Sequence, residues 1–246
     1  MARQCGSVGA HGRAGHRQIP AGGRAPARRT GRSRVLLWAI VLTLGGVAPR
    51  TVAVAAAVPS TPGPATLERF VVVPGESQAV YRAGEVFFGQ QNRFNVAVGT
   101  THAIQGELWI DRTDPRRSRI GTMTVNISTL KSDQERRDSA IRTWWLESSR
   151  FPTAQFTPTA IRGLLEAYVR GQEVFVQIEG RLRIRQVTRP VTFAARLLLD
   201  GHTLSGTATT TILMTDFGFD PPSILGILKA ENQVNLELHL TARTAG

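Results

Sequence analysis

The feature that most constrains the fold is a long alternation of apolar and polar residues at 173–201, with the sequence EVFVQIEGRLRIR-QVTRP-VTFAARLLLDG. A period of two residues puts successive side chains on opposite faces, which predicts a half-buried β-strand. The period returns after QVTRP, where Val191, Phe193 and Leu197 share one face. We expect QVTRP to turn the chain, with Pro190, which lacks an amide donor, at the start of the second strand. A hairpin of this length needs further strands to cover its apolar face.

Other segments supply such strands. Alternation or short apolar runs recur at residues 69–73, 77–88, 94–112, 121–130, 153–161, 203–214 and 231–243. Most connections between them are short, which favours antiparallel pairing. Nearly every segment has one apolar and one polar face, which favours a barrel over a sandwich. We therefore expect an all-β fold, a closed antiparallel barrel of about eight strands.

One segment, about 132–147, is predicted to be a helix that covers one end of the barrel. Ser132 and Glu135 have the spacing of a capping box at its start. Helical spacing then separates two faces. The apolar face comprises Ala140, Ile141, Trp144 and Trp145, and the outward face comprises Arg136, Arg137, Asp138 and Arg142.

The net charge of +12 is distributed unevenly along the chain. Residues 1–67 contain nine arginines and no acidic residue, so the remainder carries 21 basic against 18 acidic side chains. A nearly neutral domain lacks the broad positive field that holds nucleic acid, and nucleic acid is not an expected partner. The charge indicates three parts: a basic leader at 1–57, a Pro/Ser-rich linker at 58–67, and a β-domain at 68–246.

The leader has the layout of a secretory signal, because its basic region precedes an apolar block at 35–48 and small residues at 53–57. We expect export to the periplasm or the cell exterior, and an uncleaved N-terminal membrane anchor is the alternative. The single cysteine, Cys5, precedes the apolar block and would leave with the leader. The exported domain would then have no disulfide and no thiolate ligand for a metal.

The β-domain shows no established catalytic motif, such as G-x-S-x-G or a phosphate-binding glycine loop. His102, His202 and His239 are scattered, so no metal is expected. If the domain were nevertheless an enzyme on a lipid-like substrate, His102 and Asp216 would be the candidate groups and would have to converge on one pocket.

Small inward residues leave room inside the predicted barrel. Gly106, Ala154, Gly180, Ala195, Gly206 and Ala208 are the residues concerned. We therefore expect a cavity for one small ligand, while a filled barrel that serves as an interaction module is the alternative. The candidate cavity wall comprises Ile104, Leu108, Val125, Ile127, Phe156, Val176, Ile178, Leu182, Val191, Phe193, Leu197, Val234 and Leu236.

Three local motifs, in this order, resemble the YceI-like family of lipid- or polyisoprenoid-binding proteins. They are F-P-x-A-x-F at 151–156, the strand running into V-T-R-P-V at 182–191, and T-D-F-G at 215–218. Family members usually carry His-Gly where this chain has Arg185 and Gln186. The resemblance covers residues from about 77 to 243.

The resemblance implies a lipocalin-like barrel that holds a long isoprenoid, a quinone or another lipid in its interior, without catalysis. Trp144, Trp145, Phe217 and Arg185 are the candidates for the cavity mouth. No cofactor is implied beyond such a lipid. Contact with a membrane would come only through the leader or through ligand exchange, and a homodimer is left open.

Overall fold

The alternation at 173–201 forms a hairpin of β9 (Glu173–Ile184) and β10 (Val187–Asp200). Its register pairs Ile178 with Phe193 and Val176 with Ala195, so the predicted apolar faces lie together. The chain reverses through two residues, Arg185 and Gln186, slightly earlier than predicted. Arg185 takes the positive φ of 55° that such a tight turn needs at its first central position.

This computed structural model describes residues 66–224 and 227–245, which belong to one unit, Pro59–Gly246. The predicted leader at 1–57, its export signal, and all but the end of the 58–67 linker lie outside the described residues.

All strand pairs in the described part of the chain are antiparallel. The remaining strands are β1 (Leu67–Val72), β2 (Gln78–Phe87), β3 (Arg93–Thr101), β4 (Ile104–Gln105), β5 (Glu107–Asp111), β6 (Arg119–Ile120), β7 (Met123–Asn126), β8 (Thr153–Arg162), β11 (Thr203–Leu213), β12 (Ser223–Ile224) and β13 (Leu228–Thr244). Short 3₁₀ turns occupy Pro74–Glu76, Phe88–Gln90, Pro115–Arg117, Ile127–Thr129 and Met214–Phe217.

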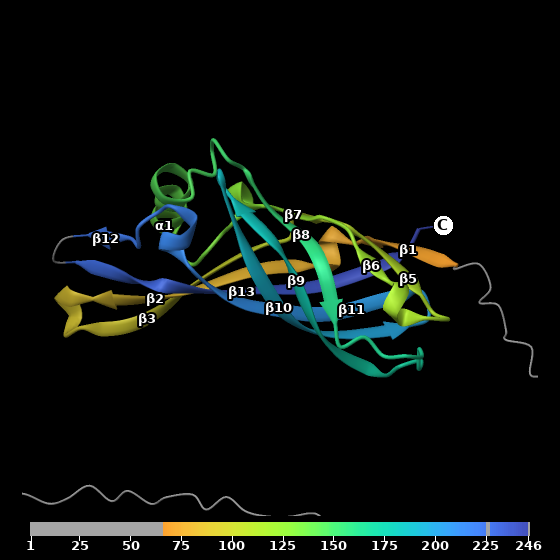
Figure 1. The fold of residues 1–246 in the computed structure, drawn as a ribbon. Coiled ribbons are helices and arrows are strands. Elements are labelled where there is room, and N and C mark those ends of the chain that lie inside the picture. The colour runs from red at the N-terminus through yellow and green to blue at the C-terminus, as the bar shows by residue number, and fades with distance from the viewer. Residues whose placement is uncertain (1–65, 225–226, 246) are drawn as a thin grey trace, which may run out of the picture. The chain divides into compact units, whose positions relative to one another are not determined.

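The main path of the sheet follows the order β4-β7-β8-β9-β10-β11-β13-β1-β5-β6. The sheet is strongly curled (Figure 1). The long strand β13 changes partner along its length, pairing with β2 through residues 228–239 and with β1 through residues 242–244. The hairpin of β2 and β3 therefore branches from the main path at one end of the sheet.

The all-β, antiparallel prediction is confirmed, but the count of eight is wrong. The described residues form thirteen strands, partly because the single strand expected at 94–112 is divided into β3, β4 and β5. The closed eight-stranded form of the barrel is not confirmed, and what the structure has is a curled sheet with a branch.

The predicted helix at about 132–147 is shorter than expected. It consists of α1 (Glu135–Ala140) and a π-helical turn, Ile141–Trp145. The capping box is absent, because the N-cap residue is Gln134 and makes no side-chain capping bond. Ser132 instead donates its hydroxyl to the Asp138 carboxylate at 2.7 Å and its amide to both carboxylate oxygens at 3.0 Å.

The predicted faces of this helix are partly wrong. Asp138 and the side chain of Arg137 are buried, whereas Trp144 is 74% exposed. Neighbouring helical residues point about 100° apart, so Trp144 and Trp145 do not share one face. The burial of Arg137 and Asp138 depends on partners elsewhere in the chain, which helical periodicity does not encode.

Different elements lie at the two ends of the described sheet (Figure 1). α1 and β12 lie at one end, and β1, β5 and β6 lie at the other. A dense apolar cluster occupies the second end, with Phe70 and Ile104 fully buried together with Leu108, Met123 and Leu204. Leu108 and Met123 of this cluster also border the open space of the interior, which extends from them to the helix.

Candidate functional site

A cavity of about 490 Å³ lies inside the curled sheet. Its wall is built by the inward residues of β2, β7 to β11 and β13, and it reaches α1 and the segment around β12. Nearly all these side chains are aliphatic or aromatic. The chemistry of the wall suits an apolar ligand.

Ten of the thirteen predicted wall residues line this cavity. They are Leu108, Val125, Ile127, Phe156, Ile178, Leu182, Phe193, Leu197, Val234 and Leu236. The other three, Ile104, Val176 and Val191, do not. Ile104 and Val176 are buried in core clusters beside residues that line the cavity, and Val191 packs beside the cluster that contains Leu182. Alternation gives the face of a side chain but not its depth along the interior.

The four residues predicted at the mouth have different roles. Trp145 lines the cavity together with Ile141 and Leu146. Trp144 points to solvent, and Phe217 is a core residue that is only 1% exposed. The mouth assignment of Phe217 is therefore wrong, and that of Trp144 stays a prediction.

Arg185, the fourth of these residues, does not line the cavity, and its place at the mouth stays a prediction. Its guanidinium forms an ion pair with Glu147 and donates to the carbonyl oxygens of Trp145 and Gly218, both at 3.4 Å. The Arg185 side chain therefore links the β9–β10 turn to the end of the helical segment and to the T-D-F-G loop.

At three of the small inward residues, neighbouring atoms rather than open space occupy the place of a side chain. A Cβ on Gly180 would lie 2.5 Å from the Phe156 ring, and one on Gly106 would lie 2.1 Å from the Met123 sulfur. Gly206 borders the cavity, but a Cβ on it would lie 2.5 Å from the Arg196 carbonyl oxygen. Ala154 and Ala208 border the cavity as well. The open space predicted beside the small inward residues is therefore present at only some of them.

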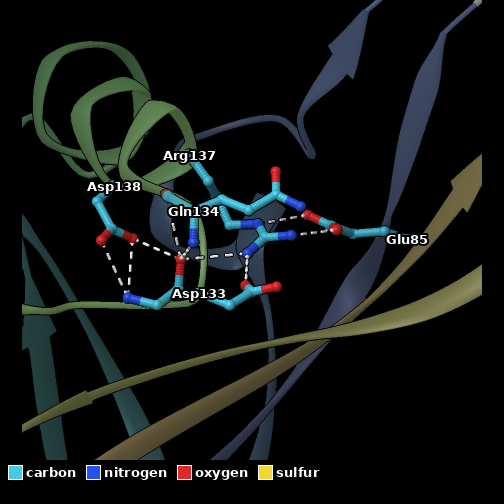
Figure 2. Close-up of polar contacts among 6 residues, drawn as sticks. Glu85, Asp133, Gln134, Arg137 and Asp138 are labelled. Carbon is cyan, nitrogen blue, oxygen red and sulfur yellow. Dashed lines mark hydrogen bonds and ion pairs between the residues drawn. The ribbon is translucent and has the colours of Figure 1, made fainter.

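A polar cluster that the sequence did not predict lies at the helix end of the cavity (Figure 2). Arg137 donates from Nε and Nη2 to the two carboxylate oxygens of Glu85, at 3.1 and 2.9 Å. Both side chains are less than a tenth exposed, and both border the cavity. Gln134 and the exposed Arg136 border it as well.

The same guanidinium also binds the start of the helix. Its Nη1 donates to the Ser132 hydroxyl at 3.1 Å and to the Asp133 carboxylate. The sequence carried two signals of this cluster: Asp133 and Arg137 are spaced i, i+4, and Glu85 falls on the inward face of its strand. Neither signal identifies Glu85 as the partner, which lies 52 residues from Arg137.

Tyr81 is a further polar residue in the cavity wall. Its hydroxyl oxygen is buried and has no hydrogen-bond partner among the described residues. Burial raises the pKa of Tyr81 to about 12, and Arg137 opposes this effect only in part. The hydroxyl therefore stays protonated at physiological pH.

The two groups named for an enzyme do not come together. His102 and Asp216 are both exposed, and neither lines the cavity. The His102 ring bonds instead to the carbonyl of Ser77 at 2.7 Å.

Within residues 66–224 and 227–245, no group of three or more His, Cys, Asp or Glu side chains is placed to hold a metal ion. The helices of this part of the chain are too short or too polar to span a membrane.

Known proteins with related sequences or folds support one family. A UPF0312 protein of Shewanella baltica is 28% identical over 152 residues, which cover 59% of this chain and 73% of that protein. The crystal structure of BcnA from Burkholderia cenocepacia has a TM-score of 0.54 at 16% identity, covering 69% of this chain and 98% of BcnA.

A polyisoprenoid-binding domain from Saccharophagus degradans has a TM-score of 0.53 at 9% identity, covering 73% of this chain and all of that domain. At these identities the two structural likenesses concern the fold. Residues 70–242 match the YceI-like domain, most of the described structure. The chain therefore belongs to the YceI-like domain family.

Proposed function

We propose that this protein binds a long isoprenoid or other lipid chain in the cavity inside its curled sheet. The observation that carries the proposal is the cavity of about 490 Å³, whose wall is almost wholly aliphatic and aromatic. Transfer of an apolar chain from water to such a wall is favourable by roughly 25 cal/mol per Å² of buried surface. The polyisoprenoid-binding neighbour of similar fold supports the isoprenoid class.

We also infer that the sheet acts as a closed wall around the ligand. Strands β4 and β5 are separated only by Gly106, and they pair on opposite sides, β4 with β7 and β5 with β1. The Val72 amide donates to the carbonyl of Gly106 at 3.0 Å, so the backbone pairing continues between the two strands. These contacts favour a barrel that closes through residues 104–111.

The proposed action is carriage or sequestration without catalysis, in the periplasm or outside the cell. The basic leader with its apolar block supports export. The separation of His102 and Asp216 from the cavity removes the pair on which the enzyme hypothesis relied. The filled-barrel alternative is disfavoured, because Val125, Phe156 and Ile178 border open space.

Organic extraction of the natively purified full-length protein, followed by mass spectrometry, tests the proposal. We expect a prenyl or acyl species in an amount comparable to that of the protein. A matched pair of variants tests whether the ligand lies in the cavity. Ala208→Trp fills the cavity and should reduce the extracted lipid, whereas Thr209→Trp adds the same group to the exposed face and should not. Repeated absence of lipid from the wild-type protein, together with no uptake of added lipid, contradicts the proposal.

A further inference from the structure

The cavity contains an unusual polar group, the hydroxyl of Tyr81. Its oxygen is buried and has no protein partner within the described residues, although its side chain lies in the cavity wall. A buried hydroxyl without a partner is destabilising, because it has lost its hydrogen bonds to water. Such a group in an apolar wall is typical of a position completed by a ligand.

The ring of Tyr81 is held in place by the neighbouring strand. Tyr81 on β2 pairs with Gly99 on β3, and a Cβ on Gly99 would lie 2.1 Å from the Tyr81 ring. The glycine therefore lets the aromatic ring lie across β3. This arrangement fixes the direction of the hydroxyl and reduces the entropy lost when it binds a ligand.

The charges near Tyr81 favour a neutral ligand group. Four of the five N–H groups of Arg137 are used by Glu85, Ser132 and Asp133. The Arg137 guanidinium and the carboxylates of Glu85, Asp133 and Asp138 all influence the pKa of Tyr81. Glu85, Asp133 and Asp138 outnumber Arg137 and the exposed Arg136, which also borders the cavity. This end of the cavity therefore disfavours a phosphate, and the Tyr81 hydroxyl is free to donate.

We propose that the Tyr81 hydroxyl donates a hydrogen bond to an uncharged carbonyl or hydroxyl oxygen on the cavity ligand and so selects neutral lipids over lipid phosphates. This inference rests on the proposed lipid-binding function and adds to it the class of polar group. The apolar chain of the ligand would then occupy the cavity between Phe156 and Leu236.

Three probes with the same fifteen-carbon chain test the inference: farnesal, farnesene and farnesyl phosphate. Binding to the full-length protein is measured by tryptophan fluorescence, since Trp145 lines the cavity. Tyr81→Phe should weaken binding of farnesal by about fivefold relative to farnesene, the loss of one hydrogen bond. Binding of farnesene, which has no oxygen, should be unchanged.

The second tyrosine of this chain supplies the matched control. Tyr168 donates its hydroxyl to the Leu199 carbonyl at 3.1 Å and does not line the cavity. Tyr168→Phe should therefore leave the ratio of the farnesal and farnesene affinities unchanged. Gly99→Ala keeps the Tyr81 hydroxyl but displaces its ring, and should lower the ratio as Tyr81→Phe does.

The outcomes separate this inference from the function on which it rests. If the wild-type protein binds none of the probes, lipid binding itself is contradicted. If it binds farnesene and farnesal but Tyr81→Phe leaves their ratio unchanged, only the role of Tyr81 is overturned. Tighter binding of farnesyl phosphate than of farnesal overturns the selectivity for neutral lipids.

Discussion

Glu85 on β2 and Arg137 on α1 form a two-point ion pair between side chains that are 7% and 9% exposed (Figure 2). The pair joins the helix to the sheet at the end of the cavity. Because both groups are removed from water, each depends on the other for its charge to be tolerated. Their separation should therefore affect both stability and the position of the helix.

Arg137→Ala should lower the free energy of unfolding by about 3 kcal/mol, since Glu85 would remain buried without its partner. Urea denaturation of the full-length protein measures the change.

The double variant Glu85→Leu/Arg137→Leu should recover most of this loss, because no unpaired charge then remains inside. A double variant as unstable as Arg137→Ala would show that the helix contact, rather than the isolated carboxylate, sets the cost.

Ile178 and Arg181 test the two faces of β9. Ile178 lines the cavity and is 7% exposed, whereas Arg181 is exposed on the opposite face. Ile178→Arg should abolish lipid retention or folding, because an unpaired charge would enter an apolar interior. Arg181→Ala should change the free energy of unfolding by less than about 0.5 kcal/mol. Similar stability and lipid content in the two variants would contradict the assignment of the faces.

Gly180 provides a packing test on the same strand. A methyl group there would lie 2.5 Å from the Phe156 ring and 2.6 Å from the Thr157 carbonyl oxygen. Because the backbone oxygen cannot move as a flexible side chain does, Gly180→Ala should lower stability by about 1 to 3 kcal/mol. Thermal denaturation measures this loss. Gly75→Ala is the control, since no atom lies within 4 Å of its added methyl group.

The adjacent tryptophans should differ in their effect on the cavity. Trp145→Ala removes part of its wall and should weaken binding of an apolar probe such as farnesene, while Trp144→Ala removes a side chain that is 74% exposed. We expect a loss of about tenfold for Trp145→Ala, since a large aromatic contact is removed. Equilibrium partitioning of radiolabelled farnesene measures both variants, and equal losses would contradict the assignment.

Stability at high pH should depend on Tyr81. Burial raises its pKa from 10 in the unfolded chain to about 12 in the folded protein. Its contribution to the free energy of unfolding is therefore fully present below pH 10 and is lost as the pH rises toward 12, by an amount on the order of 2 kcal/mol. Tyr81→Phe should show a correspondingly smaller decline across this window in urea denaturation. An identical decline in the two proteins would contradict the burial of the hydroxyl in solution.

Sequence alternation predicted the sheet and the hairpin correctly because both depend on a local period of two. Leu182 and Phe193, assigned to the apolar face, both line the cavity. Ile104 and Val176 have the same pattern but lie in the packed core. Their difference from Leu182 is a matter of depth in the curled sheet, which depends on the twist and offset of many strands together.

The helix, too, could be predicted only in part from the local sequence pattern. Periodicity located it but assigned Arg137 and Asp138 to solvent, since charged residues are rarely buried unless they are paired. Their partners are Glu85, 52 residues away, and Ser132, in the irregular segment before the helix.

The sequence by itself determined an antiparallel β-domain with an apolar interior, because side-chain period and turn residues act locally. Only the tertiary structure decided where the interior stays open and which polar groups border it. Tyr81 illustrates the reason: its hydroxyl has no partner among the described residues and lies near the Glu85–Arg137 pair, because β2 pairs with β3 and binds Arg137 of α1. Contacts between segments so distant in sequence arise from packing of the whole domain, and no local pattern encodes them.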